Sequence, residues 1–116
     1  MKEDNVIVKK SYDFAVLCVM TYKKIVTEKK EWVLPKQFLK SATSIGANVE
    51  EAIGAHSTKD FISKLTIAYK EARETHYWLR IMKETEYITE AQFSSIENDL
   101  SEILKILTRI QKTSKN

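Results

Sequence analysis

The residues best suited to chemistry lie together near the middle of the chain, directly after a run of small side chains. Asn48, Glu50 and Glu51 follow residues 41–47, of which six are small. Because the whole stretch has a helical pattern, Asn48 and Glu51 share one face of the helix, whereas Glu50 points elsewhere. Carboxylates held on one helix face can act in acid–base chemistry or bind a metal ion.

A later helical segment offers polar partners to this face. Its candidates are Glu71, Arg73, Glu74, His76 and Arg80. The functional interpretation is a carboxylate site, and the structural one is a hydrogen-bonded network that fixes the register of two helices. Buried polar groups need hydrogen-bond partners, which favours the network. Its expected members are Asn48, Glu51, Glu74 and Arg80.

Metal chemistry finds no support in the spacing of the ligand residues. Di-iron bundles place a glutamate three residues before a histidine on two of their helices. The residues three before His56 and His76 are Ile53 and Arg73, so neither position completes this motif. The single cysteine makes a structural zinc site equally poor. No metal and no cofactor are predicted.

The single cysteine, Cys18, lies between Leu17 and Val19. An exposed thiol beside a base would be a nucleophile, but an apolar setting predicts a buried and unreactive thiol. No other nucleophile–base pair can be assembled from these residues, and the sequence therefore predicts a protein that is not an enzyme.

Lysines gather on both sides of the first predicted turn. We expect the candidate phosphate-binding residues to be Lys23, Lys24, Lys30, Lys36 and Lys40. Glu28 and Glu31 dilute this cluster, and solvated surface lysines are the alternative explanation. Since the chain has no glycine-rich phosphate loop and no RNA-recognition aromatic motif, any binding of RNA or DNA would be mostly electrostatic.

Four helices must position these residues, and they are predicted at 9–30, 35–54, 58–85 and 90–112. Pro35 suits a first helical turn. Ser57 with Asp60, and Thr89 with Gln92, have the spacing of a capping box. The short connections make neighbouring helices antiparallel, so residues 1–116 are predicted to form a single domain, an all-α, up-down-up-down four-helix bundle.

Apolar residues at alternating spacings of three and four support this architecture, since such seams are typical of antiparallel bundles. The seams are Phe38, Ala42, Ile45, Val49 and Ala52; Phe61, Leu65, Ala68, Ala72, Thr75, Leu79 and Met82; and Phe93, Ile96, Leu100, Ile103, Leu107 and Ile110. Gly46 beside the first seam costs about 1 kcal/mol relative to alanine within a helix. We therefore expect another backbone packed closely against it.

The first helix carries more apolar surface than one bundle face requires. Residues 14–20 form an uninterrupted apolar run that covers nearly two turns, so its side chains point in every direction. The excess predicts a homo-oligomer whose interface includes Val16, Leu17 and Met20. Trp78 is expected there as well, because the adjacent aromatic residues 77 and 78 cannot both face one core. The alternative is that long loops, or residues 6–8, fold back over this surface.

Composition agrees with a small helical domain. The chain has 116 residues, two glycines, one proline and a net charge of +3. Its single cysteine favours a reducing compartment. Residues 1–10 are charged and have no long apolar run, so no signal peptide is expected there. The longest apolar run is too short to span a membrane. A cytoplasmic location and no membrane partner are expected.

Residues 37–54 read QFLKSATSIGANVEEAIG, and residues 68–79 read AYKEARETHYWL. Together with Ser57, Lys59, Phe61 and Lys64, these segments resemble the four-helix bundle family that includes the 23S rRNA intervening-sequence proteins and the accessory variability proteins of diversity-generating retroelements. Residues 86–88 are similar to the hinge before the family's last helix, where the family usually carries glycine and this chain carries Glu86.

The resemblance implies a bundle assembled as a ring, commonly a homopentamer. It also implies binding of DNA or RNA and, as for the retroelement members, a reverse transcriptase as partner. The expected function is therefore a non-catalytic nucleic-acid-binding or assembly accessory protein. The alternative is a protein-interaction scaffold that binds no nucleic acid.

Overall fold

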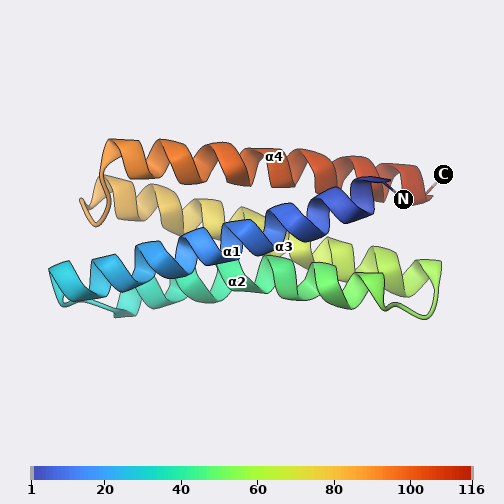
Figure 1. Ribbon diagram of the computed structural model, residues 1–116, viewed down its shortest axis with the longest axis horizontal. Helices are drawn as coiled ribbons and strands as arrows, with labels where there is room; N and C mark the ends of the chain where they lie inside the picture. Colours follow the sequence, from blue (N-terminus) through green and yellow to red (C-terminus); the bar gives the residue numbers. More distant parts are fainter. Residues whose placement is uncertain (1, 116) are drawn as a thin grey trace.

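The computed structural model describes residues 2–115, and the burial of side chains from Asp4 to Ser114. This part of the chain is all-α, with no strand. The four helices are α1 (Lys2–Lys29), α2 (Val33–Ile53), α3 (Thr58–Glu84) and α4 (Glu90–Lys115). Figure 1 shows that successive helices run in opposite directions, as predicted. None of the described helices is both long and apolar enough to cross a membrane.

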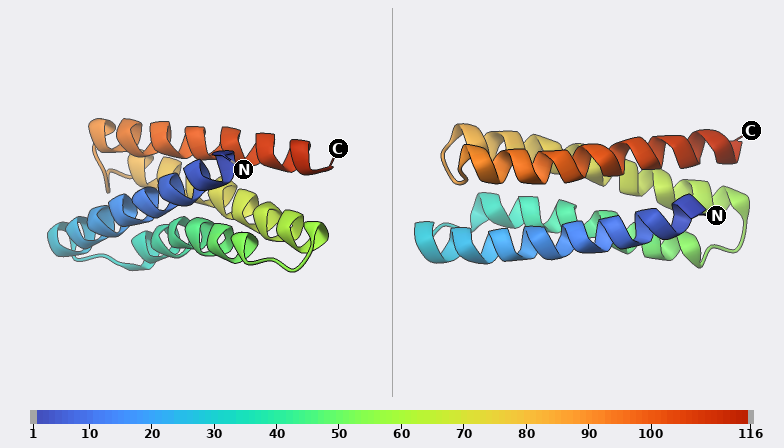
Figure 2. Two further views of the ribbon diagram at one scale, coloured as in Figure 1. Left: turned by 45° about the vertical axis from the view of Figure 1, so that its right-hand side comes forward. Right: turned by 45° about the horizontal axis from the view of Figure 1, so that its top comes forward.

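The helices form an elongated bundle of 45 × 21 × 19 Å in which each helix contacts two neighbours. Along the chain these contacts join α1 to α2, α2 to α3 and α3 to α4, and α4 closes the bundle against α1. The α1–α2 and α3–α4 turns lie at one end, and the α2–α3 turn lies at the other, near both termini (Figures 1 and 2). Residues 23–40 therefore all lie toward the same end of the molecule.

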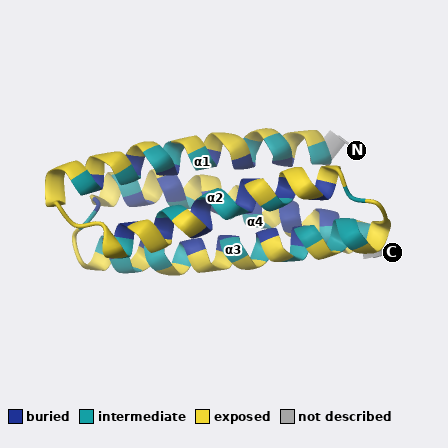
Figure 3. Ribbon diagram, turned by 90° about the horizontal axis from the view of Figure 1, so that it is seen from below, coloured by how far each residue is buried: buried dark blue, intermediate teal, exposed yellow. Residues whose placement is uncertain are grey.

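The core confirms the predicted seams of α2, α3 and α4. Every seam residue is buried except Phe61, which is half-buried and packs against the core. Figure 3 shows buried positions on the inward side of each helix and exposed positions along the outer side. Three-four spacing thus identified the buried faces correctly.

The first helix begins at Lys2, and the predicted start at residue 9 was wrong. Ile7 is buried in the core, where it continues the inward stripe of Phe14 and Cys18 by helical spacing. Residues 6–8 are consequently part of α1 and do not fold back over it, which removes that alternative cover for the apolar run. The density of charge near the N-terminus concealed this apolar stripe.

The close approach expected at Gly46 is present, and its partner is the backbone of α1. A methyl group at Gly46 would lie 3.2 Å from the carbonyl oxygen of Ser11. On the α3 side of α2, the hydroxyl of Thr75 donates a hydrogen bond of 3.0 Å to the hydroxyl of Ser41, and both residues are buried. Small residues thus bring α2 close to both of its neighbours.

The helix starts follow the predicted signals: both capping boxes are present, and Pro35 lies in the first turn of α2. The hydroxyl of Ser57 accepts from the amide of Asp60, and Thr89 and Gln92 exchange two hydrogen bonds of 2.8 and 3.1 Å at the start of α4. The N-terminal cap of α2, Trp32, makes no side-chain hydrogen bond to the helix. Lys30 follows the end of α1, and Glu86 lies two residues after the end of α3. Their φ values are 54° and 65°, in the left-handed region that favours glycine.

Candidate nucleic-acid interface

The α1–α2 turn is one of two basic regions of the sequence, and the other is the C-terminal stretch of residues 103–116, which carries four cations and no carboxylate. Residues 23–40 contain six lysines and two glutamates, a balance of four positive charges, whereas the whole chain has a net charge of only +3. The predicted residues Lys23, Lys24, Lys30, Lys36 and Lys40 are all exposed. No ion pair joins any of these five to another described side chain.

The lysines surround the turn instead of lying on one face. Lys23 and Lys24 are neighbours in sequence and so project from α1 about 100° apart. On α2, Lys40 lies within electrostatic range of Glu71 of α3. Burial, with help from Glu74, raises the pKa of the Glu71 carboxyl, and Lys40 opposes this effect.

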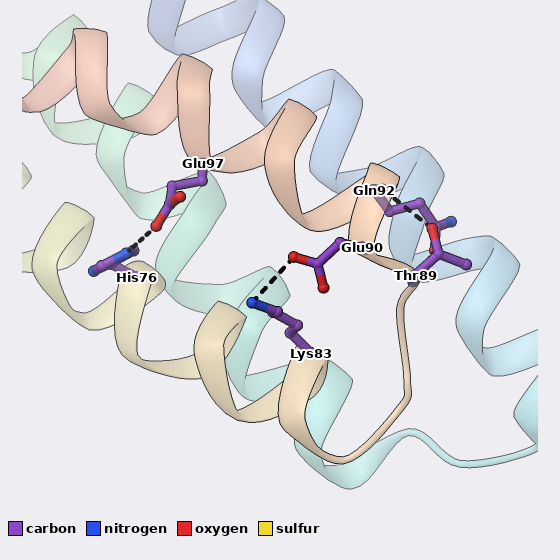
Figure 4. Close-up of polar contacts among 6 residues, drawn as sticks. All are labelled: His76, Lys83, Thr89, Glu90, Gln92 and Glu97. Carbon is purple, nitrogen blue, oxygen red and sulfur yellow. Dashed lines mark hydrogen bonds and ion pairs between the residues drawn. The ribbon is translucent and has the colours of Figure 1, made fainter.

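Carboxylates outnumber cations in a cleft at the same end of the bundle, next to the α1–α2 turn. This cleft, of about 530 Å³, lies between the last turn of α1 and the α3–α4 hinge. Its carboxylates come from Glu28, Glu84, Glu86 and Glu90, and its cations from Lys29 and Lys83. Lys83 forms an ion pair of 3.2 Å with Glu90 (Figure 4). An anion would therefore be attracted to the α1–α2 turn and repelled from the hinge.

The four residues expected to form a polar network are not joined to one another. Asn48 donates to the carbonyl oxygen of Ser44 in its own helix, and Glu51 pairs with Lys64 of α3 at 2.8 Å. Glu74 accepts a hydrogen bond from the indole of Trp78, and the Arg80 guanidinium lies 6.0 Å from the centre of the Tyr77 ring. Helical spacing placed these side chains on plausible faces, but their partners depend on the rotation of each helix.

Sequence reasoning missed the polar contacts that cross from helix to helix elsewhere. His76 and Glu97 meet at 2.8 Å between α3 and α4 (Figure 4), and Lys10 and Glu102 meet between α1 and α4. The Lys10 hydrogen bond and charge lower the pKa of the exposed Glu102 carboxyl. These pairs are far apart in sequence, so no local pattern could have revealed them.

The outer side of α1 carries an exposed apolar stripe of Tyr12, Val16 and Met20, with exposed fractions of 65%, 47% and 60%. These residues are four apart and so follow one another along one face. Beside Tyr12, a groove of about 230 Å³ lies between α1 and α2, and Gly46 and Ala47 help to line it. Tyr12 was not among the predicted interface residues.

The other two predicted interface residues lie further inward. Leu17 and Trp78 are half-buried and pack against the core. Of the adjacent aromatic pair, Tyr77 is the more exposed, at 50%. The expectation that one ring faces outward therefore fits Tyr77 better than Trp78.

Cys18 is buried, and this burial raises the pKa of its thiol far above the ordinary value. The thiol therefore stays protonated and is a poor nucleophile. Within the described part of the chain, no three histidine, cysteine, aspartate or glutamate residues are grouped so that they could hold a metal ion.

Comparisons with known proteins agree with the bundle. The family model of the 23S rRNA-intervening sequence proteins matches residues 3–109. The chain is also similar to a crystal structure from Bacteroides thetaiotaomicron, described as a protein with unknown function from the S23 ribosomal protein family. The two are 55% identical with a TM-score of 0.93, over 95% of this chain and 98% of the other. No curated protein matches.

Proposed function

This chain belongs to the family of 23S rRNA-intervening sequence proteins, and from that premise we propose that it is a non-catalytic, cytoplasmic accessory protein that binds nucleic acid. In this proposal it assembles as a ring-like homo-oligomer, a pentamer, like the retroelement accessory variability proteins that its sequence resembles. A reverse transcriptase is the corresponding candidate partner. The observation that carries the proposal is the group of five exposed lysines around the α1–α2 turn that have no carboxylate partner within the described residues.

The charge distribution supports binding to a polyanion. The five exposed lysines have no carboxylate partner within the described chain, so phosphates can replace their counterions without breaking an ion pair. A pentamer would multiply the net charge of +3 to +15. Several turns of this kind on one assembly would bind a strand more tightly than one turn alone.

The outer side of α1 supports the oligomer. Tyr12, Val16 and Met20 present apolar surface beside a groove lined by small residues. Because α1 itself contains residues 6–8, these residues do not cover the stripe. An apolar stripe next to a groove is the kind of surface that a second copy can bury.

The test is a titration of RNA and of duplex DNA with the protein at about 50 and 200 mM salt. We expect both to bind, with an affinity that falls at least tenfold between the two salt concentrations, because phosphate contacts release counterions. Absence of binding, or an affinity that does not depend on salt, would overturn the proposal.

A protein-interaction scaffold is the second candidate function, and a surface on α3 favours it. The exposed Tyr77 lines a pocket of about 430 Å³ together with Arg80, Lys83 and Phe93. Aromatic and arginine side chains of this kind are enriched in protein interfaces. A partner that remains bound after nuclease treatment, and is lost in Tyr77→Ala, would favour the scaffold.

A further inference from the structure

The α1–α2 turn combines its lysines with an exposed aromatic side chain. Trp32 is 58% exposed and the adjacent Val33 is 70% exposed. The Trp32 indole makes no hydrogen bond to another described residue, whereas the chain's other tryptophan, Trp78, is half-buried and donates to Glu74. A tryptophan left open to solvent in a short turn does little for the core of this bundle, which suggests a role in binding.

The basic residues lie on both sides of Trp32 along the chain. Lys29 and Lys30 precede it at the end of α1, and Lys36 follows it in the first turns of α2, all of them exposed. Proteins that bind single strands stack the bases on aromatic side chains and contact the phosphate backbone with nearby basic side chains. In a duplex the bases are already stacked on one another, so an aromatic side chain can reach a base face only by unstacking it.

We propose that Trp32 is a stacking platform for an unpaired base, and that the α1–α2 turn therefore prefers single-stranded nucleic acid to duplex. This inference rests on the proposed function, and it names the ligand class of the same site. Lys30 and Lys36 bind the backbone on either side of the stacked base, and Val33 extends the apolar surface. The carboxylates of the hinge cleft, which Lys29 and Lys83 balance only in part, repel the strand from the α3–α4 hinge.

Two other occupants can cover an exposed tryptophan with lysines. An anionic membrane surface would take Trp32 and Val33 into its interface. Glu28 and Glu31 oppose negative lipids and nucleic-acid phosphates alike, so the vesicle titration decides between a membrane and a nucleic acid. A second copy of the chain, packed with its own α1–α2 turn against this one, would bury Trp32. The lysines of the two turns would then face and repel one another. Both occupants give distinct results in the experiment below.

The experiment follows the fluorescence of Trp32 in the full chain carrying Trp78→Phe, which leaves Trp32 as the single tryptophan. The probes are an oligothymidylate of about 16 nucleotides and a duplex of the same length. We expect the single strand to quench Trp32 emission strongly and the duplex to quench it little. If Trp78→Phe does not fold, the same signal is obtained from wild type by subtracting the emission of Trp32→Phe.

Affinities measured with labelled strands separate stacking from charge. Trp32→Ala should weaken binding of the single strand about tenfold, because one base–aromatic stack is lost, and should change duplex binding less than about twofold. Trp32→Phe should keep most of the single-strand affinity. Lys36→Gln should lower the affinity for the single strand and for the duplex alike, because it removes a phosphate contact.

Several results would overturn the inference. If Trp32→Ala binds single strands as well as wild type while Lys36→Gln weakens them, stacking is wrong and the proposed nucleic-acid function stands. If neither strand binds, both ideas fall. Quenching or a blue shift of Trp32 by phosphatidylserine vesicles alone would make a membrane the occupant, and protection of Trp32 from acrylamide in the free protein would make it a subunit contact.

Discussion

Single residues decide how closely the helices of this bundle approach one another. At Gly46 the missing side chain allows the α1 backbone to pass within 3.2 Å of where a methyl group would lie. At Ser41 a buried hydroxyl pairs with Thr75 of α3. The sequence indicated the close approach, because a glycine inside a helix needs a compensating contact. It did not identify Ser11 as the neighbour, since that depends on how α1 is rotated.

Gly46→Val tests this close approach. We expect it to lower the free energy of unfolding by about 2 kcal/mol, because the new branched side chain must displace the Ser11 backbone. Denaturant unfolding measures the effect. Gly54→Ala is the matched control, because a methyl group there would meet only the Glu51 carbonyl oxygen at 3.8 Å, and it should change stability by less than about 0.5 kcal/mol. Equal effects of the two changes would show that the approach at Gly46 is not tight.

Helices and their connections set which side chains share an end of the molecule. Seam spacing and capping boxes predicted α2, α3 and α4 to within a few residues, because both signals are local. The start of α1 was missed, since charged neighbours surround its buried Ile7. The polar pairs between helices could not be predicted, because Lys10 and Glu102 lie 92 residues apart.

The α3–α4 hinge offers a prediction at this scale. Glu86 has a φ of 65°, a backbone conformation that is strained for any residue with a Cβ atom and is favourable only for glycine. Glu86→Gly should therefore raise the free energy of unfolding by about 1 kcal/mol, as measured by denaturant unfolding. Glu86→Ala is the control: it removes the same carboxylate but keeps a Cβ atom, so it should give little gain. A Glu86→Gly protein no more stable than Glu86→Ala would contradict this explanation of the hinge.

The whole molecule presents two surfaces that its own core does not need. The outer side of α1 is apolar at Tyr12, Val16 and Met20, and the α1–α2 turn is basic. Residues 14–20 predicted an apolar excess, because one helix buries only one stripe. The sequence did not predict which residues are exposed: Leu17 and Trp78 are half-buried, whereas Tyr12 and Tyr77 are exposed.

The mass of the protein in solution tests whether the apolar stripe of α1 is an interface between copies of the chain. Five copies of the 13.5 kDa chain would have a mass of about 67.5 kDa, and light scattering of wild type should give this value. Val16→Glu places a carboxylate in the stripe at an already exposed position, so we expect it to dissociate the assembly and leave the helix content unchanged. Ile67→Glu, at an exposed apolar position on α3, is the control and should keep the mass. A wild-type mass near 13.5 kDa would contradict the oligomer.

If the α1–α2 turn binds nucleic acid, removing charge there should weaken binding more than removing the same charge elsewhere. One variant changes Lys23, Lys24, Lys36 and Lys40 to glutamine, and the control changes the exposed Lys59, Lys70, Lys105 and Lys112 of α3 and α4. Lys30 is left in place so that the residue at the left-handed φ of 54° is unchanged. Both variants lose four positive charges, so they differ only in where the charge is removed.

The measurement is the affinity for single-stranded RNA as a function of salt. We expect at least a tenfold loss of affinity for the variant at the turn, with a salt slope shallower by about 0.7 for each phosphate contact removed. For the control we expect a loss of less than about threefold, because distant charges are screened. Equal losses in the two variants, or no loss in either, would contradict the claim that this turn is the binding site.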